Sequence, residues 1–146
     1  MQNILGHWNT IIENHKFSIP YNPESCLCMV DLIDVAKVVS KIMLNPSHYF
    51  ATYQIVGQCI SHNEIAKILT YFLGTKIRVE TLFPDKLKNE VEDNGMHDES
   101  VVMLSKMFSY YDMHGFRGNN NILSWLLDRS PTTYNQFLKR IFTESI

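Results

Sequence analysis

The chain has 146 residues, of which 45% are hydrophobic and 12% aromatic, and its 13 Lys and Arg against 15 Asp and Glu give a net charge of −2. A near-neutral chain without a clustered basic face is not typical of proteins that bind nucleic acid or a membrane surface. The first residues contain neither a basic stretch nor a long apolar run, so we expect no signal peptide and no membrane span. The length is sufficient for a single domain, residues 1–146, with its own core.

The three cysteines, Cys26, Cys28 and Cys59, cannot all pair with one another. Their low number is typical of reduced thiols, so we expect a cytoplasmic protein. Cys26 and Cys28 lie two residues apart on a predicted strand, where they face the same side and could share a metal ion. Small buried cysteines are more frequent than such sites, so we expect no metal.

The first half of the chain alternates helical and strand patterns. Apolar residues at helical spacing predict an amphipathic helix of about three turns over residues 4–15, followed by an extended or turning segment at 17–23. Further helices are expected before Asn45-Pro46 and before Gly74. Short apolar or alternating runs predict strands at residues 27–30, 52–57 and 76–82. This alternation indicates an α/β part over residues 1–82.

The second half of the chain is mostly helical by its pattern. We expect a polar helical piece over residues 84–91, a long amphipathic helix over 99–114 that ends at Gly115, and a short apolar segment at 122–127. A final helix is expected to begin at Ser130-Pro131, because serine is a favourable cap and proline fits the first helical turn. The fold class is therefore α/β, with a few short strands and a helix-rich second half over residues 83–146.

Two helix starts carry acidic side chains with a structural explanation. Ser61 and Glu64 have the spacing of a capping box, in which each side chain bonds the other residue's backbone amide. Asp31 and Asp34 stand at the entrance of the preceding helix and resemble a paired-carboxylate site. Because carboxylates at this position usually cap the helix and compensate its dipole, we interpret this pair as structural.

The usual catalytic and phosphate-binding motifs are missing. The sequence has no Gly-x-Gly-x-x-Gly, P-loop, Gly-x-Ser-x-Gly or His-Glu-x-x-His motif, and no Tyr-x-x-x-Lys pair. Tyr110, Tyr111 and Trp125 form an aromatic group that fits either an apolar ligand pocket or plain core. Arg117, beside three asparagines, fits either an anion contact or a solvated loop. These four residues are our candidate ligand contacts from the pattern alone.

The order of the motifs is more informative than any single motif. In sequence they are Met1-Gln2-Asn3-Ile4, Phe17-Ser18-Ile19-Pro20, Met29-Val30-Asp31-Leu32-Ile33-Asp34-Val35-Ala36, Asn45-Pro46, Thr52-Tyr53-Gln54-Ile55-Val56-Gly57, Ser61-His62-Asn63-Glu64-Ile65-Ala66 and Leu73-Gly74. This order resembles the C-terminal half of NmrA-like proteins, which are atypical short-chain dehydrogenases/reductases of extended type. The resemblance covers most of the chain, and the segment from Val30 to Ala36 followed by Tyr53 to Gly57 is its most specific part.

The resemblance implies where a substrate would bind and which cofactor-binding loop this sequence lacks. In the family, the N-terminal half carries the glycine-rich NAD(P) loop and most of the parallel sheet, and this sequence has neither. The family's Met-x-Asn segment lies near the nicotinamide and substrate, so the resemblance adds Gln2 and Asn3 to the candidate substrate-binding residues. It implies NAD(P)H at family level, but we expect no cofactor binding by this chain alone.

Three functional interpretations remain open at this stage. The chain is a substrate lobe reduced to a non-catalytic module that binds a small molecule or a protein, or it is half of an NAD(P)H-dependent oxidoreductase that needs another chain. The third is a truncated product without independent activity. Apolar surface shaped to pack against a missing half tends to find a partner, so we expect either a homo-oligomer or docking onto a complementary Rossmann-containing chain.

Overall fold

The computed structural model describes residues 1–82 and 98–144, and its contacts divide the chain into two compact units. Unit 1 comprises Met1–Trp8, Cys28–Ile60 and Arg117–Ile146, and unit 2 comprises Asn9–Leu27 and Ser61–Phe116. Each unit is assembled from separate stretches of chain, so neither corresponds to residues 1–82 or to 83–146. In the part of the chain that the structure describes, no helix has both the length and the apolar character needed to cross a membrane.

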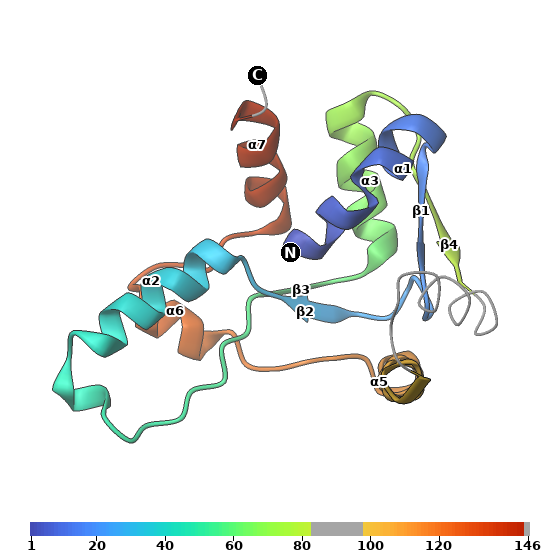
Figure 1. Cartoon of the computed structure of the whole chain (residues 1–146). Helices are drawn as coiled ribbons and strands as arrows, with labels where there is room; N and C mark the ends of the chain where they lie inside the picture. The colour runs from blue at the N-terminus through green and yellow to red at the C-terminus, as the bar shows by residue number, and fades with distance from the viewer. Residues whose placement is uncertain (83–97, 145–146) are drawn as a thin grey trace. The chain divides into compact units, whose positions relative to one another are not determined.

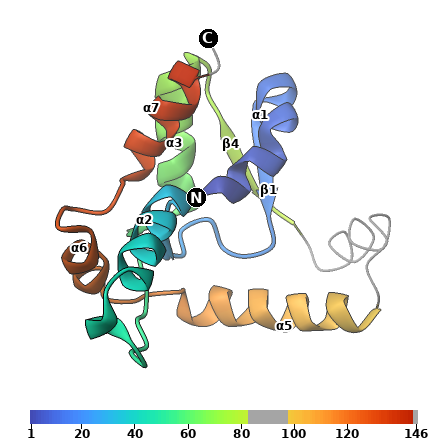
Figure 2. The ribbon, with the colours of Figure 1, turned by 60° about the vertical axis from the view of Figure 1, so that its left-hand side comes forward.

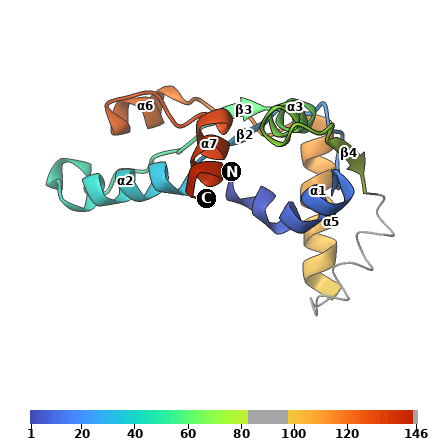
Figure 3. The same cartoon turned by 90° about the horizontal axis from the view of Figure 1, so that it is seen from above.

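Unit 1 combines a small sheet with helices. Its elements are the 3-10 helix η1 (Gln2–His7), β2 (Leu27–Met29, whose first residue belongs to unit 2), α2 (Leu32–Met43), the 3-10 helix η2 (Pro46–His48), β3 (Gln58–Ile60), α6 (Asn121–Leu127) and α7 (Tyr134–Glu144). Strands β2 and β3 pair in a two-stranded sheet. Helices α2 and α6 run beside each other (Figures 1 and 3), and Val38, Leu123 and Leu126 form the fully buried core between them.

Unit 2 is organised around a parallel strand pair. It contains α1 (Trp8–Asn14, whose first residue belongs to unit 1), β1 (Lys16–Ile19), α3 (His62–Leu73), β4 (Arg78–Thr81) and α5 (Asp98–His114). β1 and β4 are parallel, with Phe17 opposite Val79 and Ile19 opposite Thr81. Figure 2 shows these strands side by side, with α3 next to β4. The structure thus confirms the α/β class with few short strands.

The capping predictions for α2 and α3 are confirmed. Asp31 is the N-cap of α2, and its carboxylate accepts a hydrogen bond from the Ile33 amide at 3.2 Å. Ser61 and Glu64 form the complete capping box of α3. Gly74 ends α3 with a φ of 66°, a left-handed conformation that glycine adopts without the steric penalty of a side chain.

The side chains of Asp31, the N-cap of α2, and Asp34, in its first turn, also bind the C-terminal segment of unit 1. Arg140 of α7 donates to both carboxylate oxygens of Asp31, at 2.8 and 3.1 Å. Asp34, which is fully buried, accepts from the Arg129 guanidinium, from the Thr132 backbone amide at 2.7 Å and from its hydroxyl at 3.0 Å. The pair is therefore structural, as the sequence suggested, and it ties α2 to the segment that leads into α7.

The predicted start of the final helix and the predicted strand at residues 52–57 are both wrong. The final helix begins at Tyr134 instead of Ser130-Pro131, because the Thr133 hydroxyl accepts from the Gln136 amide while the Gln136 side chain accepts from the Thr133 amide. Residues 52–57, predicted to be a strand, lie in no strand of the structure, and β3 begins only at Gln58. The predicted piece at 84–91 lies outside the described residues.

Cys28 and Cys59 form a disulfide, so the expectation of reduced thiols is wrong for these two residues. They lie on the adjacent strands β2 and β3, at positions 31 apart in the sequence. Cys26 is free and partly buried. The disulfide occupies the Cys28 sulfur, which a metal site shared with Cys26 would require. No cluster of three or more metal-ligating side chains occurs among the described residues.

Candidate ligand-binding site

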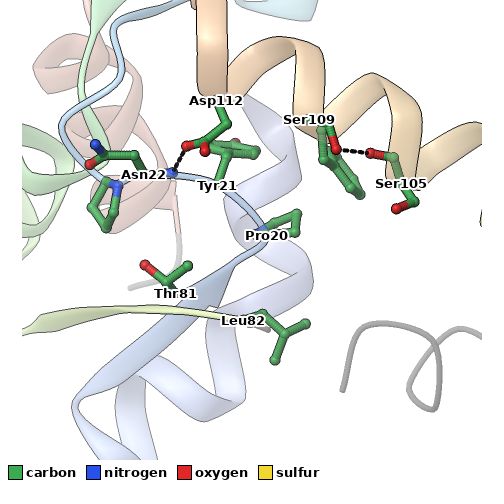
Figure 4. A pocket seen from close by; sticks show the side chains of 10 residues that line it. Pro20, Tyr21, Asn22, Thr81, Leu82, Ser105, Ser109 and Asp112 are labelled. Atoms are coloured by element: carbon green, nitrogen blue, oxygen red, sulfur yellow. Dashed lines mark hydrogen bonds between the residues drawn. The ribbon is translucent and has the colours of Figure 1, made fainter. Parts of the chain in front are cut away.

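Unit 2 contains a cavity of about 350 Å³ at one end of its strand pair. This volume lies within the range of small-molecule pockets, roughly 300 to 1,000 Å³. We call it the aromatic pocket, and Figure 4 shows the side chains around it. The residues that line it are Pro20, Tyr21, Asn22, Pro23, Thr81, Leu82, Ser105, Phe108, Ser109 and Asp112.

The parallel strands explain why the cavity forms at this place. Ile19 and Thr81 are opposite each other at the last positions of β1 and β4. The chain leaves both strands at the same edge, where Pro20 and Tyr21 follow β1 and Leu82 follows β4 (Figure 4). Proline fixes φ and cannot donate to the sheet, so the chain turns away after β1 and leaves space beyond the strand ends.

Helix α5 supplies the other wall of the aromatic pocket. Ser105, Phe108, Ser109 and Asp112 have the i, i+3, i+4, i+7 spacing of a single helix face. The Ser109 hydroxyl donates to the Ser105 carbonyl at 2.9 Å. The Asp112 carboxylate accepts from the Asn22 backbone amide at 2.7 Å (Figure 4). This second bond holds the turn after β1 against α5.

Aromatic rings pack closely around Tyr21. Its ring centroid lies 5.9 Å from that of Phe108 and 6.1 Å from that of Tyr111, both within the range of favourable ring pairs. Its hydroxyl lies 3.4 Å from the His62 Nε2 atom. Burial, helped by the neighbouring Tyr111 hydroxyl, raises the pKa of Tyr21 to about 12. Tyr21 is therefore a neutral phenol at physiological pH. Its hydroxyl can form hydrogen bonds, and its ring offers an aromatic face for packing.

This arrangement suits binding more than acid-base chemistry. A tyrosine that acts as a general acid has its pKa lowered towards neutrality by a nearby cation, whereas the pKa of Tyr21 moves in the opposite direction. Asp112 is the only charged residue in the described lining of the pocket. The cavity thus offers aromatic faces, hydroxyl groups and one negative charge.

Of the predicted contacts in α5, Tyr111 borders this region and Tyr110 does not. Tyr111 packs on Tyr21 and also on Phe116, at 5.6 Å between ring centroids. Tyr110 is 56% exposed and stacks on His114, one turn later, at 4.7 Å. Neither tyrosine is among the residues that line the cavity.

Gln2 and Asn3 lie in η1 of unit 1. Gln2 Nε2 donates to Asp31 at 2.6 Å and Gln2 Oε1 accepts from the Leu32 amide at 3.3 Å, so both ends of this side chain bind the start of α2. Burial alone raises the pKa of Asp31, but the hydrogen bonds from Arg140, Gln2 and Ile33 outweigh it and lower that pKa below its usual value. Asn3 is exposed.

Arg117 and Trp125 also belong to unit 1. Arg117 is exposed, as expected of a solvated loop. Trp125 is 59% exposed, and its ring packs on His48 and Tyr53 with centroids 6.0 Å away in each case. The roles of all six predicted residues in ligand binding stay predictions.

The sequence pattern did not single out the residues that line the aromatic pocket. Tyr21 stands in a stretch that was notable only for its two prolines and an asparagine. One face of α5 mixes polar and aromatic side chains, so the sequence does not show it as an apolar stripe. Its residues are Ser105, Phe108, Ser109 and Asp112. Its helical spacing is the one signal that would have identified it.

A second, polar cavity of about 540 Å³ lies in unit 1. None of its described lining residues is charged. They are Gln58, Cys59, Gly118, Asn120, Asn121, Ser124, Ser130, Pro131 and Thr133.

The sequence matches the model of the NmrA-like family over residues 1–141. The chain belongs to the NmrA-like family. No curated protein matches it significantly. Among solved structures, it is similar to a nucleoside-diphosphate-sugar epimerase from Staphylococcus aureus, with 21% identity and a TM-score of 0.76. An NADPH-dependent quinone oxidoreductase from Escherichia coli has 18% identity and a TM-score of 0.79.

The NmrA-like chain spans about half the length of these proteins. The match with the epimerase covers 94% of our chain and 48% of the epimerase. The match with the quinone oxidoreductase covers 97% of our chain and 51% of that enzyme. A triphenylmethane reductase from Citrobacter, solved with NADP(H), is similar over 92% of our chain and 47% of its own, with 17% identity and a TM-score of 0.75. The E. coli enzyme has likewise been solved with NADPH.

The N-termini of α2 and α3 do not fit the pyrophosphate of NAD(P)H. Such a group binds at a helix N-terminus with free amides, often beside a glycine-rich turn. The N-termini of α2 and α3 are instead occupied by the carboxylates of Asp31 and Glu64, which repel phosphate. Gly74 and Gly115 adopt positive φ, but both follow the C-terminal ends of helices, where carbonyl groups point outward.

Proposed function

We propose that this NmrA-like chain is a ligand-binding lobe without catalytic activity of its own. The observation that carries the proposal is the aromatic pocket of unit 2, in which Tyr21, Phe108 and Asp112 converge beyond the strand ends. The raised pKa of Tyr21 and the carboxylates at the N-termini of α2 and α3 both favour binding over redox chemistry. The chain therefore acts by holding a small molecule that it does not transform.

The pocket's chemistry indicates the class of ligand. Flat aromatic groups pack well against the rings of Tyr21 and Phe108, and a positive charge is attracted both to ring faces and to the Asp112 carboxylate. An anionic ligand would meet one negative charge and no cation in the described lining. We therefore infer that the pocket prefers neutral or cationic aromatic molecules to anionic ones.

A pair of dye titrations tests this preference. Malachite green, a cationic triarylmethane dye, and fluorescein, an anionic aromatic dye, are titrated into the full chain while their optical signals are recorded. We expect malachite green to bind at least about tenfold more tightly, which corresponds to roughly 1.4 kcal/mol. Equal affinity for the two dyes would remove the proposed role of Asp112.

Two variants locate the binding. Asp112→Asn keeps an oxygen that accepts from the Asn22 amide but removes the charge, so it should weaken malachite green binding and leave fluorescein binding unchanged or stronger. Asp128→Asn is the matched control, because Asp128 is an exposed acid in unit 1. If both variants have the same effect on dye affinity, the dye is held by net charge and the pocket assignment is wrong.

The alternative is half of an NAD(P)H-dependent oxidoreductase that needs a second polypeptide for its cofactor. Its support is that the chain spans about half of two reductases that have been solved with their cofactors. NADPH titration separates the two functions, because the ligand-binding lobe should show no binding at micromolar concentrations. Micromolar binding of NADPH by this chain alone would overturn the first proposal.

A further inference from the structure

The Cys28–Cys59 disulfide of unit 1 joins a buried position to an exposed one. Cys28, on β2, is 8% exposed, whereas Cys59, in the middle of β3, is an exposed residue. The two strands lie side by side (Figure 1) and have three residues each. A molecule in solution therefore meets this bond at Cys59 before it can reach Cys28.

Cys59 also lines the polar cavity of unit 1. This cavity has a volume of about 540 Å³, which is enough for a small molecule. Gln58 and Cys59 of β3 form part of its wall, and the first turn of α6 contributes Asn121 and Ser124 to another part. The exposed end of the disulfide thus lies on the wall of a cavity that a small reagent can enter.

The lining of the polar cavity supplies amide and hydroxyl groups. The Gln58 side-chain oxygen accepts from the Tyr134 backbone amide at 2.6 Å. The Ser124 hydroxyl donates to the Asn120 carbonyl at 3.1 Å, and the Asn120 side chain makes no capping bond to α6. Amide side chains both donate and accept hydrogen bonds, and the described lining contains no Asp or Glu that would repel an anion. These groups suit a molecule that carries peptide and carboxylate groups.

We propose that Cys59 is a thiolation site, at which a small peptide-like thiol such as glutathione enters the polar cavity and opens the disulfide. The thiolate sulfur of glutathione bonds to Cys59 Sγ while the bond between Cys59 Sγ and Cys28 Sγ breaks. The electron pair of that bond stays on Cys28 Sγ, which takes up a proton from water. The product is a mixed disulfide on Cys59 and a thiol at Cys28. A second glutathione thiolate can attack the glutathione sulfur, so that Cys59 becomes a thiol and oxidised glutathione forms.

Access to the two sulfur atoms decides which of them is attacked. The incoming thiolate must approach in line with the sulfur–sulfur bond, on the far side of the sulfur that it attacks. Attack on Cys28 would release the thiolate of the exposed Cys59, which water stabilises, so equal access would favour Cys28 as the target. Burial of Cys28 reverses this preference, because the attacking thiol would have to enter the protein interior. We therefore expect the mixed disulfide at Cys59 in the folded chain and loss of this selectivity in the unfolded chain.

Trapping followed by peptide mapping tests the proposal on the full chain. Cys26, which is free, is first blocked with iodoacetamide, glutathione is then added, and the reaction is stopped at several times with N-ethylmaleimide. In the folded chain we expect glutathione on Cys59 and N-ethylmaleimide on Cys28, in at least about tenfold excess over the reverse pattern. In urea the two patterns should become comparable. The proposal is overturned if glutathione is found mainly on Cys28, or if glutathione opens the disulfide only in urea.

Charge variants test whether the thiol passes through the polar cavity. Asn121→Glu places a negative charge in the lining and should slow the opening of the disulfide by about fivefold, because it repels the thiolate. Asn121→Lys should accelerate the opening by a similar factor. Gln54→Glu and Gln54→Lys are the matched controls, since Gln54 is an exposed residue of unit 1 outside the described cavity lining. Equal effects at positions 54 and 121, or no effect at position 121, would show that the thiol does not use the cavity and would overturn the proposal.

Discussion

Replacement of Asp34 tests whether α2 holds the segment before α7 in place. Asp34 is fully buried and accepts three hydrogen bonds, two of them from Thr132 and one from Arg129. Asp34→Ala leaves the partly buried Thr132 amide and hydroxyl without this acceptor. Asp34→Asn removes the charge but keeps one oxygen that accepts from the Thr132 amide. The two variants therefore separate the charge from the hydrogen-bonding geometry.

The expected cost follows from the exposure of each partner. Breaking a fully buried ion pair costs about 3 to 5 kcal/mol, because the remaining charge is stranded without solvent. The Arg129 side chain is 40% exposed, so water rehydrates it and the cost is smaller. An unsatisfied partly buried amide adds about 1 to 3 kcal/mol. We expect Asp34→Ala to lower the free energy of unfolding by about 2 to 3 kcal/mol and Asp34→Asn by about 1 kcal/mol.

Urea unfolding followed by circular dichroism measures these differences, and hydrogen exchange of the Thr132 amide locates them. Asp128→Asn is the control, because the Lys41–Asp128 pair has an Asp128 side chain that is 77% exposed. An exposed pair contributes about 0 to 1 kcal/mol, so this variant should stay close to wild type. If Asp34→Ala costs no more than Asp128→Asn, the buried network does not hold the segment before α7 and the reasoning fails.

Three further predictions concern other parts of the chain. Gly57→Ala should destabilise the protein more than Gly74→Ala in urea unfolding, because a Cβ at position 57 would lie 2.3 Å from a backbone oxygen while position 74 has free space and only an unfavourable φ; equal losses would contradict this. Hydrogen bonds lower the pKa of Asp31 in the folded chain, so Asp31 stabilises the fold at pH values above its pKa in the unfolded chain, about 4. This contribution is lost as the pH falls through the folded pKa. Asp31→Asn should therefore reduce the loss of stability on acidification, and an unchanged loss would refute the role given to Asp31. Alkylation without reductant should label only Cys26, and mass spectrometry that finds three labelled thiols would exclude the disulfide.

Local signals in the sequence predicted much of the helical structure. The capping box at Ser61, the Asp31 cap and the terminating Gly74 involve groups a few residues apart, so the pattern contains both partners. The start of the final helix was missed because two caps compete there. Ser130-Pro131 is a favourable start by composition, but Thr132 is bound by Asp34, so the helix starts after Thr133.

Features that depend on distant residues were not predictable in the same way. The alternation of residues 52–57 reflects the half-buried face that Tyr53 and Ile55 present to the core, and a strand also needs a neighbour that no local pattern specifies. The Cys28–Cys59 pairing depends on the contact of β2 with β3. The aromatic pocket needs the ends of two strands and one face of α5, so its residues are separated widely in sequence.

The central claim is that this NmrA-like chain binds a small aromatic ligand in the aromatic pocket without holding NAD(P)H. Chemical-shift mapping of the isotope-labelled full chain, titrated separately with malachite green and with NADPH, tests both parts in one measurement. The account predicts that malachite green shifts the amide signals of residues 20–23 and 105–112, and that NADPH at the same concentrations shifts none. Saturable shifts caused by NADPH, or dye shifts confined to unit 1, would contradict it.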